Sequence, residues 1–313
     1  MKMPVACGAV GVVLSAVVSA QAPTVAPAGT PPSFEVASVR PSNPNPPDPM
    51  SGMPRLMPVG GRLTVANLPL RLLIRVAYDI QDFQIVGGRS DLLSRKFDIT
   101  AKAEDGTGRT LKEMSVLLRT LLADRFALKV RTEAREAPIY ALVVARKDGA
   151  LGPAMKVSTS DCGGLEEQTQ KRLEALSKDG PAAMMKALAA GPTPCSIMPA
   201  GVPGTAGGGF GMRGNGQPME SLVRLVTPAL DRLVLDQTGL TGLYDWELHF
   251  DPEVFRRVAG QAGLNLPAPA AAVPSDSPAL MTAIQEQLGL KLEARRGPVN
   301  HLVIEHVEAP APD

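Results

Sequence analysis

An ordered set of short motifs occurs twice along this chain, and this duplication limits the folds that the chain can adopt. The matched pairs are Pro69 with Pro218, Phe97-Asp98-Ile99 with Tyr244-Asp245-Trp246, and Ala127-Leu-Lys-Val130 with Gly289-Leu-Lys-Leu292. The motif order is kept while the spacing drifts, as expected when two copies of one supersecondary unit diverge in linker length. Chance similarity between two α+β segments is the alternative.

Each copy predicts the order helix, strand, strand, helix, strand, strand, and Phe34–Val39 adds a strand before the first helix. Runs of adjacent strands favour antiparallel pairing, so the predicted fold is α+β, with two repeated units of antiparallel sheet and helices packed on one face. In the first copy we expect Leu128–Val130 and Ile139–Val144 to form a hairpin. In the second we expect two strands, Leu290–Leu292 and His301–Val307, joined by a connection that includes Arg295-Arg-Gly-Pro298.

The predicted domain organisation places a helical and loop insertion between the two units. The parts are a signal peptide (1–20), a Pro/Ala linker (21–33), a first unit (34–146), the insertion (147–208), a second unit (209–308) with an internal linker (252–276), and a tail (309–313).

The N-terminal segment resembles a secretory signal peptide. Lys2 supplies the positive start, and the apolar run Val5–Val18 is shorter than the roughly 20 residues that a transmembrane helix needs. Small residues allow cleavage after Ala20 or Ala22, and an uncleaved N-terminal anchor is the alternative. We therefore expect a secreted or periplasmic protein with no membrane span after cleavage.

Charge and cysteine content bear on the partners and the compartment that we expect for this protein. The chain has 32 basic and 31 acidic residues, and this balance gives no electrostatic reason to expect a nucleic-acid partner. After signal cleavage two cysteines remain, Cys162 and Cys195, which in an oxidising compartment are expected to form a disulfide. Such a bond contributes about 3 kcal/mol in the chain-entropy account. Two free buried thiols are the alternative.

The segment from Asp236 to Leu248 is predicted to form a strand, a glycine-containing turn and a second strand. Glycine tolerates the positive φ angles of tight turns, and Asp and Thr side chains stabilise turns by bonding to nearby backbone. The residues that we expect to form a structural signature are Asp236, Thr238, Gly239, Gly242, Tyr244, Asp245 and Gly289.

Candidate chemical groups are scattered along the sequence. His301 and His306 lie five positions apart on a β-prone run, which places their rings on opposite faces of a strand and too far apart for one metal ion. His249 is expected to be an exposed strand residue. Gly209-Phe-Gly-Met-Arg-Gly214 matches a dinucleotide-binding fingerprint in its letters, but no apolar strand precedes it and no helix follows directly, so we expect a loop.

Asp98 and Asp245 occupy matching positions in the two copies. Paired carboxylates can carry out acid–base chemistry, but an Asp between two buried apolar strand residues usually faces solvent or binds a neighbouring loop. We therefore predict no catalytic, metal-binding or cofactor-binding residue. A secreted hydrolase that uses Asp98 or Asp245, and a structural envelope protein, remain alternatives.

Several motifs together resemble an uncharacterised secreted family that is expanded in acidobacteria of the Solibacter type. These motifs are Phe34-Glu-Val-Ala-Ser-Val-Arg-Pro41, Lys96-Phe-Asp-Ile99, Leu121-Leu-Ala-Asp-Arg-Phe126, Asp236-Gln-Thr-Gly-Leu-Thr-Gly242 with Tyr244-Asp245, and Gln287-Leu-Gly-Leu-Lys-Leu292. The resemblance covers about residues 34–308, and the chain departs from it at Pro228, which interrupts a helix expected to run longer.

The resemblance implies an extracytoplasmic sensing or binding module, because some members of the family look fused to membrane-embedded metallopeptidases of the antibiotic-sensor kind. This chain lacks the zinc helix, so the resemblance implies no peptidase activity. Each unit is also similar in element order to the short N-terminal domains of secretins and TonB-dependent receptors, which implies protein–protein contact. The expected function is non-catalytic binding or sensing, and the expected partner is an unknown envelope protein or a small ligand.

Overall fold

The computed structural model describes residues 31–45, 54–103, 110–162, 195–200, 210–261 and 277–311. A first sheet lies in the N-terminal half of the chain. The sheet has the antiparallel order β1-β5-β3-β2. Its strands are β1 (Phe34–Pro41), β2 (Arg55–Val59), β3 (Arg62–Pro69) and β5 (Lys96–Ala103).

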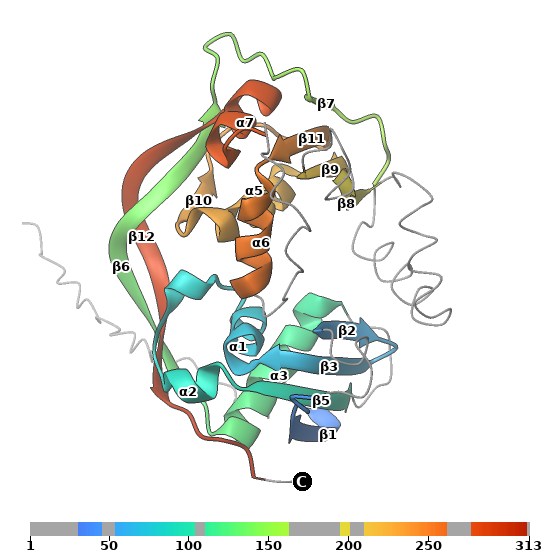
Figure 1. The fold of residues 1–313 in the computed structure, drawn as a ribbon, viewed down its shortest axis with the longest axis vertical. Helices are drawn as coiled ribbons and strands as arrows, with labels where there is room; N and C mark the ends of the chain where they lie inside the picture. The colour runs from blue at the N-terminus through green and yellow to red at the C-terminus, as the bar shows by residue number, and fades with distance from the viewer. Residues whose placement is uncertain are drawn as a thin grey trace, which may run out of the picture. The chain divides into compact units, whose positions relative to one another are not determined.

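Helices of the same half cover this sheet (Figure 1). They are α1 (Leu70–Tyr78), the short α2 (Ser90–Leu93) and α3 (Leu111–Phe126), and a 3-10 turn η1 (Asp82–Gln84) leads into strand β4 (Ile85–Gly87). The α3 helix begins with the predicted capping box, in which Thr110 and Glu113 each bond to the backbone N–H of the other. The α1 helix has Pro69 at its N-cap.

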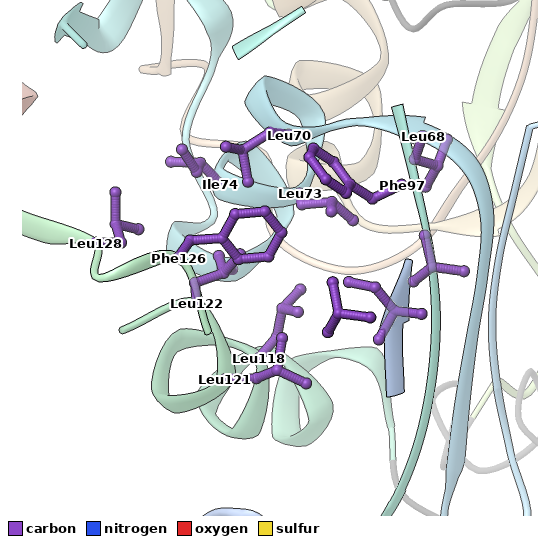
Figure 2. Close-up of a cluster of buried hydrophobic side chains, with 14 of the residues drawn as sticks. Leu68, Leu70, Leu73, Ile74, Phe97, Leu118, Leu121, Leu122, Phe126 and Leu128 are labelled. Atoms are coloured by element: carbon purple, nitrogen blue, oxygen red, sulfur yellow. The ribbon is translucent and has the colours of Figure 1, made fainter. Parts of the chain in front are cut away.

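A first apolar core forms between α1, α3 and the first sheet (Figure 2). The rings of Phe97 from β5 and Phe126 from α3 meet edge to face, with centroids 4.9 Å apart. Leucine and isoleucine side chains at helical spacing on α1 and α3 surround the two rings and are almost fully buried. Burial of this apolar face is what fixes the two helices against the sheet.

The second sheet lies in the C-terminal half and has the antiparallel order β7-β11-β9-β8. Its strands are β7 (Met155–Val157), β8 (Ser196–Ala200), β9 (Phe210–Gln217) and β11 (Tyr244–Phe250). The helices of this half are α5 (Met219–Leu230), α6 (Pro252–Gln261) and α7 (Leu280–Leu288). A second core contains Trp246 and Leu248 of β11 with Leu222 of α5 and Ile284 of α7.

The glycine-rich segment that we expected to be a loop is strand β9, so that expectation is wrong. Two of its glycines lie directly opposite large rings of β11, in the register pairs Gly211 with His249 and Gly214 with Trp246. A Cβ atom at Gly214 would lie 2.6 Å from Nε1 of Trp246, and one at Gly211 would lie 2.6 Å from Nδ1 of His249. Glycine is therefore required by the close approach of the rings, and phosphate binding is not needed to explain it.

Three further expectations about the second half are also corrected. Strands β7 and β8 come from the stretch that we interpreted as an insertion, but they pair with β11 and β9 in the second sheet. Residues 252–261 were expected to be linker and instead form α6, whose Val254, Phe255 and Val258 pack against the second core. The helix α5 continues through Pro228 to Leu230 instead of ending before it.

A long two-stranded ribbon connects the two halves (Figure 1). Its strands are β6 (Lys129–Val144) and β12 (Leu290–His306), which pair antiparallel along almost their whole length. Strand β4 adds to the ribbon in parallel with β12, and β10 (Leu233–Asp236) adds in parallel with β6, which gives a third sheet of order β10-β6-β12-β4.

The ribbon replaces the predicted strand pairs, so both of those predictions are wrong. Residues Glu133–Pro138 were expected to turn, but they contain no Gly, Asn or Asp for a tight turn and remain extended. Gly297-Pro298 has turn-like composition, yet it pairs with the extended Glu136 and Ala137 across the ribbon. Long-range pairing therefore overrides the local turn signal.

Some expectations fall outside the described residues. These are the signal peptide, the linker that follows it, and two helices expected near residues 165–176 and 181–189. Among the residues that the structure does describe, no helix combines the length and apolar character needed to cross a membrane.

Candidate functional site

A hydrogen-bonded carboxylate on the first sheet organises the loops around the main candidate site. The side chain of Asp98 on β5 accepts hydrogen bonds from the Ser42 hydroxyl, 2.6 Å away, and from the Asn67 backbone N–H, 2.8 Å away. Asn67 has φ 55°, and the pairing of β3 with β5 shifts register beside it. Asp98 thus holds a strand irregularity and the segment after β1 in place.

Asp245 has a related environment on the second sheet. Its carboxylate accepts a hydrogen bond of 2.8 Å from the backbone N–H of Gly216, which has φ 60° and lies beside a register shift between β9 and β11. Asp98 and Asp245 therefore lie on different sheets, and the described structure does not bring them together as an acid–base pair.

A hollow of about 390 Å³ lies next to the Asp98 network, at the end of β1 and the start of β5. Its walls combine apolar rings, amides and a hydroxyl with two cationic side chains. The lining residues are Pro41, Ser42, Asn43, Pro44, Asn67, Arg95, Lys96, Phe97, Ala309 and Pro310. Ser42 and Asn67, which Asp98 positions, therefore form part of the wall.

The two cations of this hollow, Arg95 and Lys96, form no side-chain hydrogen bond or ion pair with any described residue. Nearby arginines differ, because Arg89 forms an ion pair of 2.9 Å with Asp91 and Arg71 one with Asp82. Two cations without an ion-pair partner among the described residues, beside amide and hydroxyl groups, can bind the anionic group of a ligand, and the prolines can contact its apolar part.

The predicted signature residues form a compact turn. The Asp236 carboxylate accepts hydrogen bonds from the backbone N–H and the hydroxyl of Thr238, at 2.9 and 2.8 Å. Gly239 and Gly242 have φ 68° and 104°, and the Tyr244 hydroxyl donates to the carbonyl of Thr241. Gly289 is the C-cap of α7 with φ 69°. These contacts are local and structural, and none of the signature residues lines the hollow.

Cys162 and Cys195 form a disulfide with an S–S distance of 2.02 Å and a Cα–Cα distance of 5.6 Å. The bond connects the segment after β7 with the start of β8. Gly216 of β9 approaches the Cys162 sulfur so closely that a Cβ atom would not fit between them. The disulfide thus ties two edge strands of the second sheet together and indicates an oxidising, extracytoplasmic compartment.

A charged cluster on the outer face of the second sheet was not anticipated from the sequence. Glu247 accepts a hydrogen bond from Nε of Arg213, 2.7 Å away, and its other oxygen lies 2.7 Å from Nε2 of His249. Burial acts to raise the pKa of Glu247, but the hydrogen bonds from His249 and Arg213 outweigh it, and the pKa lies below its usual value. The sequence did contain a pattern for this cluster, because Glu247 and His249 lie two positions apart on a strand and therefore share one face.

The remaining histidines are apart, as their spacing predicted. Nδ1 of His301 lies 3.1 Å from the carbonyl oxygen of Val299, and Nε2 of His306 lies 3.0 Å from Glu308. In the described part of the chain, no three His, Cys, Asp or Glu side chains are grouped closely enough to hold a metal ion.

The fold and the disulfide define an α+β protein suited to an oxidising compartment. The chain belongs to the family described as "Protein of unknown function (DUF3738)", whose model matches residues 71–307. Comparison with curated proteins and with solved structures gives no match.

Proposed function

We propose that this protein is an extracytoplasmic, non-catalytic binding or sensing module, and that the hollow beside Asp98 takes its ligand. The observation that carries the proposal is the pair of cations, Arg95 and Lys96, which form no ion pair with any described residue and lie in a wall that also contains prolines. The ligand is a small molecule, or a segment of an envelope protein, that has an anionic group next to an apolar one.

The environment of the two aspartates supports a non-catalytic role. Asp98 and Asp245 each accept a backbone N–H from a residue with positive φ at a strand irregularity. Such bonds use the carboxylate to hold the backbone, and the two aspartates lie on different sheets. A hydrolase that uses Asp98 or Asp245 is therefore the weaker proposal.

We further propose that the two halves descend from one duplicated unit. The pairing orders β1-β5-β3-β2 and β7-β11-β9-β8 correspond strand for strand. Pro69 and Pro218 are the N-caps of α1 and α5, and Asp79 and Asp231 are their left-handed C-caps. This correspondence supports two linked binding units in one chain, although the hollow described above belongs to the first half.

A direct binding experiment tests the proposed ligand site. Phenyl phosphate and benzoate each combine one anionic group with one ring, and their binding can be followed by the chemical shifts of amides around the hollow. We expect Arg95→Gln to weaken binding about tenfold, which corresponds to about 1.4 kcal/mol for the loss of one charge-assisted hydrogen bond. Lys112→Gln is the matched control, because Lys112 is exposed on α3 and does not line the hollow.

Two results would count against the proposal. If neither probe shifts the amides of the hollow, or if Arg95→Gln and Lys112→Gln bind the probes equally well, the two cations do not form a binding site. Turnover of an ester or glycoside substrate that is lost in Asp98→Asn or Asp245→Asn, while folding is retained, would support the hydrolase instead.

A further inference from the structure

A segment near the C-terminus packs into the first core, whose other residues come from the N-terminal half of the chain. The segment Val299–Glu308, here called the return segment, follows the point where β12 leaves the second half. Its Leu302, Ile304 and Val307 are buried in the first core, at 4, 6 and 6% exposure. The first half of the chain therefore lacks part of its core until this distant segment is in place.

The return segment lies in a slot with strand partners on both sides. Leu302–Ile304 pair in parallel with β4, and the same residues pair antiparallel with Val130–Thr132 of β6. The side-chain amide of Gln84 donates to the carbonyl of Asn300, and the Glu308 N–H donates to the carbonyl of Phe126, at 2.8 and 2.7 Å. An empty slot would expose two strand edges and apolar surface, so its occupation is strongly favoured.

The middle of the ribbon has one face open to solvent, whereas Gly297 and Val299 on its other face are buried. On one face, every side chain from 132 to 138 on β6 and from 294 to 300 on β12 is exposed. Pro138 and Pro298 lack the N–H group that a ladder bond needs, and Gly297 lies next to Pro298. The exposed face and the two prolines make this the stretch of the ribbon where a bend loses the fewest ladder bonds, so we place the hinge of the proposal here.

We propose that the slot between β4 and β6 can accept the return segment of a second copy of this chain. In the resulting dimer, β12 opens at Gly297-Pro298, and each chain places its own Val299–Glu308 into the first core of the other. The second core stays within one chain, since Leu290 and Leu292 keep their pairing with β6. The proposal does not depend on ligand binding at the hollow.

Chain concentration during folding decides which arrangement forms. The exchanged dimer repeats the contacts of the monomer, so the two differ mainly in the entropy of bringing a second chain into position. A segment tethered in the same chain has an effective concentration on the order of 1 mM. Dilute folding therefore gives monomers, and folding near that concentration gives dimers, which persist because the return segment must leave both strand partners to revert.

Refolding of the full chain tests this proposal. The protein is unfolded in guanidinium at acidic pH, with the native disulfide kept oxidised, and is refolded at about 10 μM and about 1 mM. Light scattering after gel filtration should show less than about a tenth dimer at the lower concentration and about half at the higher one. A chain that remains monomeric at both concentrations overturns the proposal, and this measurement needs no substitution.

A pair of cysteine variants then locates the exchange. Arg131→Cys with Val303→Cys joins register partners at the slot end of the ribbon, and Val143→Cys with Lys291→Cys joins partners at the other end. After oxidation of the dimer fraction, the first pair should give a covalent dimer on a non-reducing gel, and the second should run as a monomer. A dimer whose slot-end pair runs as a monomer, or whose two pairs both cross-link the chains, contradicts an exchange at this hinge.

Discussion

Replacement of Gly214 by alanine tests the packing that explains the glycine-rich strand. A Cβ atom at this position would lie 2.5 Å from Cζ2 and 2.6 Å from Nε1 of Trp246, well inside van der Waals contact. Trp246 is only 2% exposed and lies in the second core, so the ring cannot move away without displacing its neighbours. Overpacking of this kind costs about 1–3 kcal/mol.

The expected result is a fall in melting temperature of about 2–12 °C, because 1 kcal/mol shifts the midpoint by about 2–4 °C in a domain of this size class. Trp246 is the chain's only tryptophan, so its fluorescence reports unfolding and any displacement of the ring itself. Gly260→Ala is the control, since Gly260 lies in α6 with open space around its Cα, and alanine there should stabilise by about 0.5–1 kcal/mol. A Gly214→Ala protein as stable as the unmodified chain, with unchanged emission, would refute the packing argument.

Three further predictions concern the disulfide, the strand irregularity and the ribbon. Replacing Cys162 and Cys195 by serine should lower the free energy of unfolding by about 3–4 kcal/mol, read from denaturant midpoints, because the bond closes a sequence separation of 33 residues. Asp98→Ala should cost about 1–3 kcal/mol in the same assay, since it leaves the Ser42 hydroxyl and a backbone N–H without their acceptor. Hydrogen bonds from Arg135 and Arg131 lower the pKa of Glu133 to about 2. Its contribution to stability should therefore be present above about pH 4.5 and be lost as the pH falls towards 2, and Glu133→Gln should remove this pH dependence in acid unfolding curves.

The candidate site was only partly accessible to sequence reasoning. Asp98 was identified as a structural group from its position between Phe97 and Ile99, and the structure supplies its partners, Ser42 and Asn67. The hollow beside it was not predicted, because its walls come from four separate stretches of the chain, at residues 41–44, 67, 95–97 and 309–310. No local pattern indicates that such segments meet.

The helices and strands also divide into those that local sequence indicates and those that depend on distant residues. The amphipathic stripe of α3 and its Thr110–Glu113 capping box are properties of neighbouring residues, so both can be recognised in the sequence alone. The predicted strand pairs were wrong for the opposite reason. Both segments are extended in either arrangement, and the choice of partner depends on distant residues.

What the sequence determined by itself is the α+β class, the helices with strong apolar periodicity, and the cysteine pair that the structure joins. Only the tertiary structure decided that β6 and β12 are each one continuous strand and pair with each other, and that Val299–Glu308 enters the first core. The physical reason is that helix periodicity and capping are short-range effects. The pairing of a strand is set by whichever edges and apolar surfaces the folded chain brings beside it.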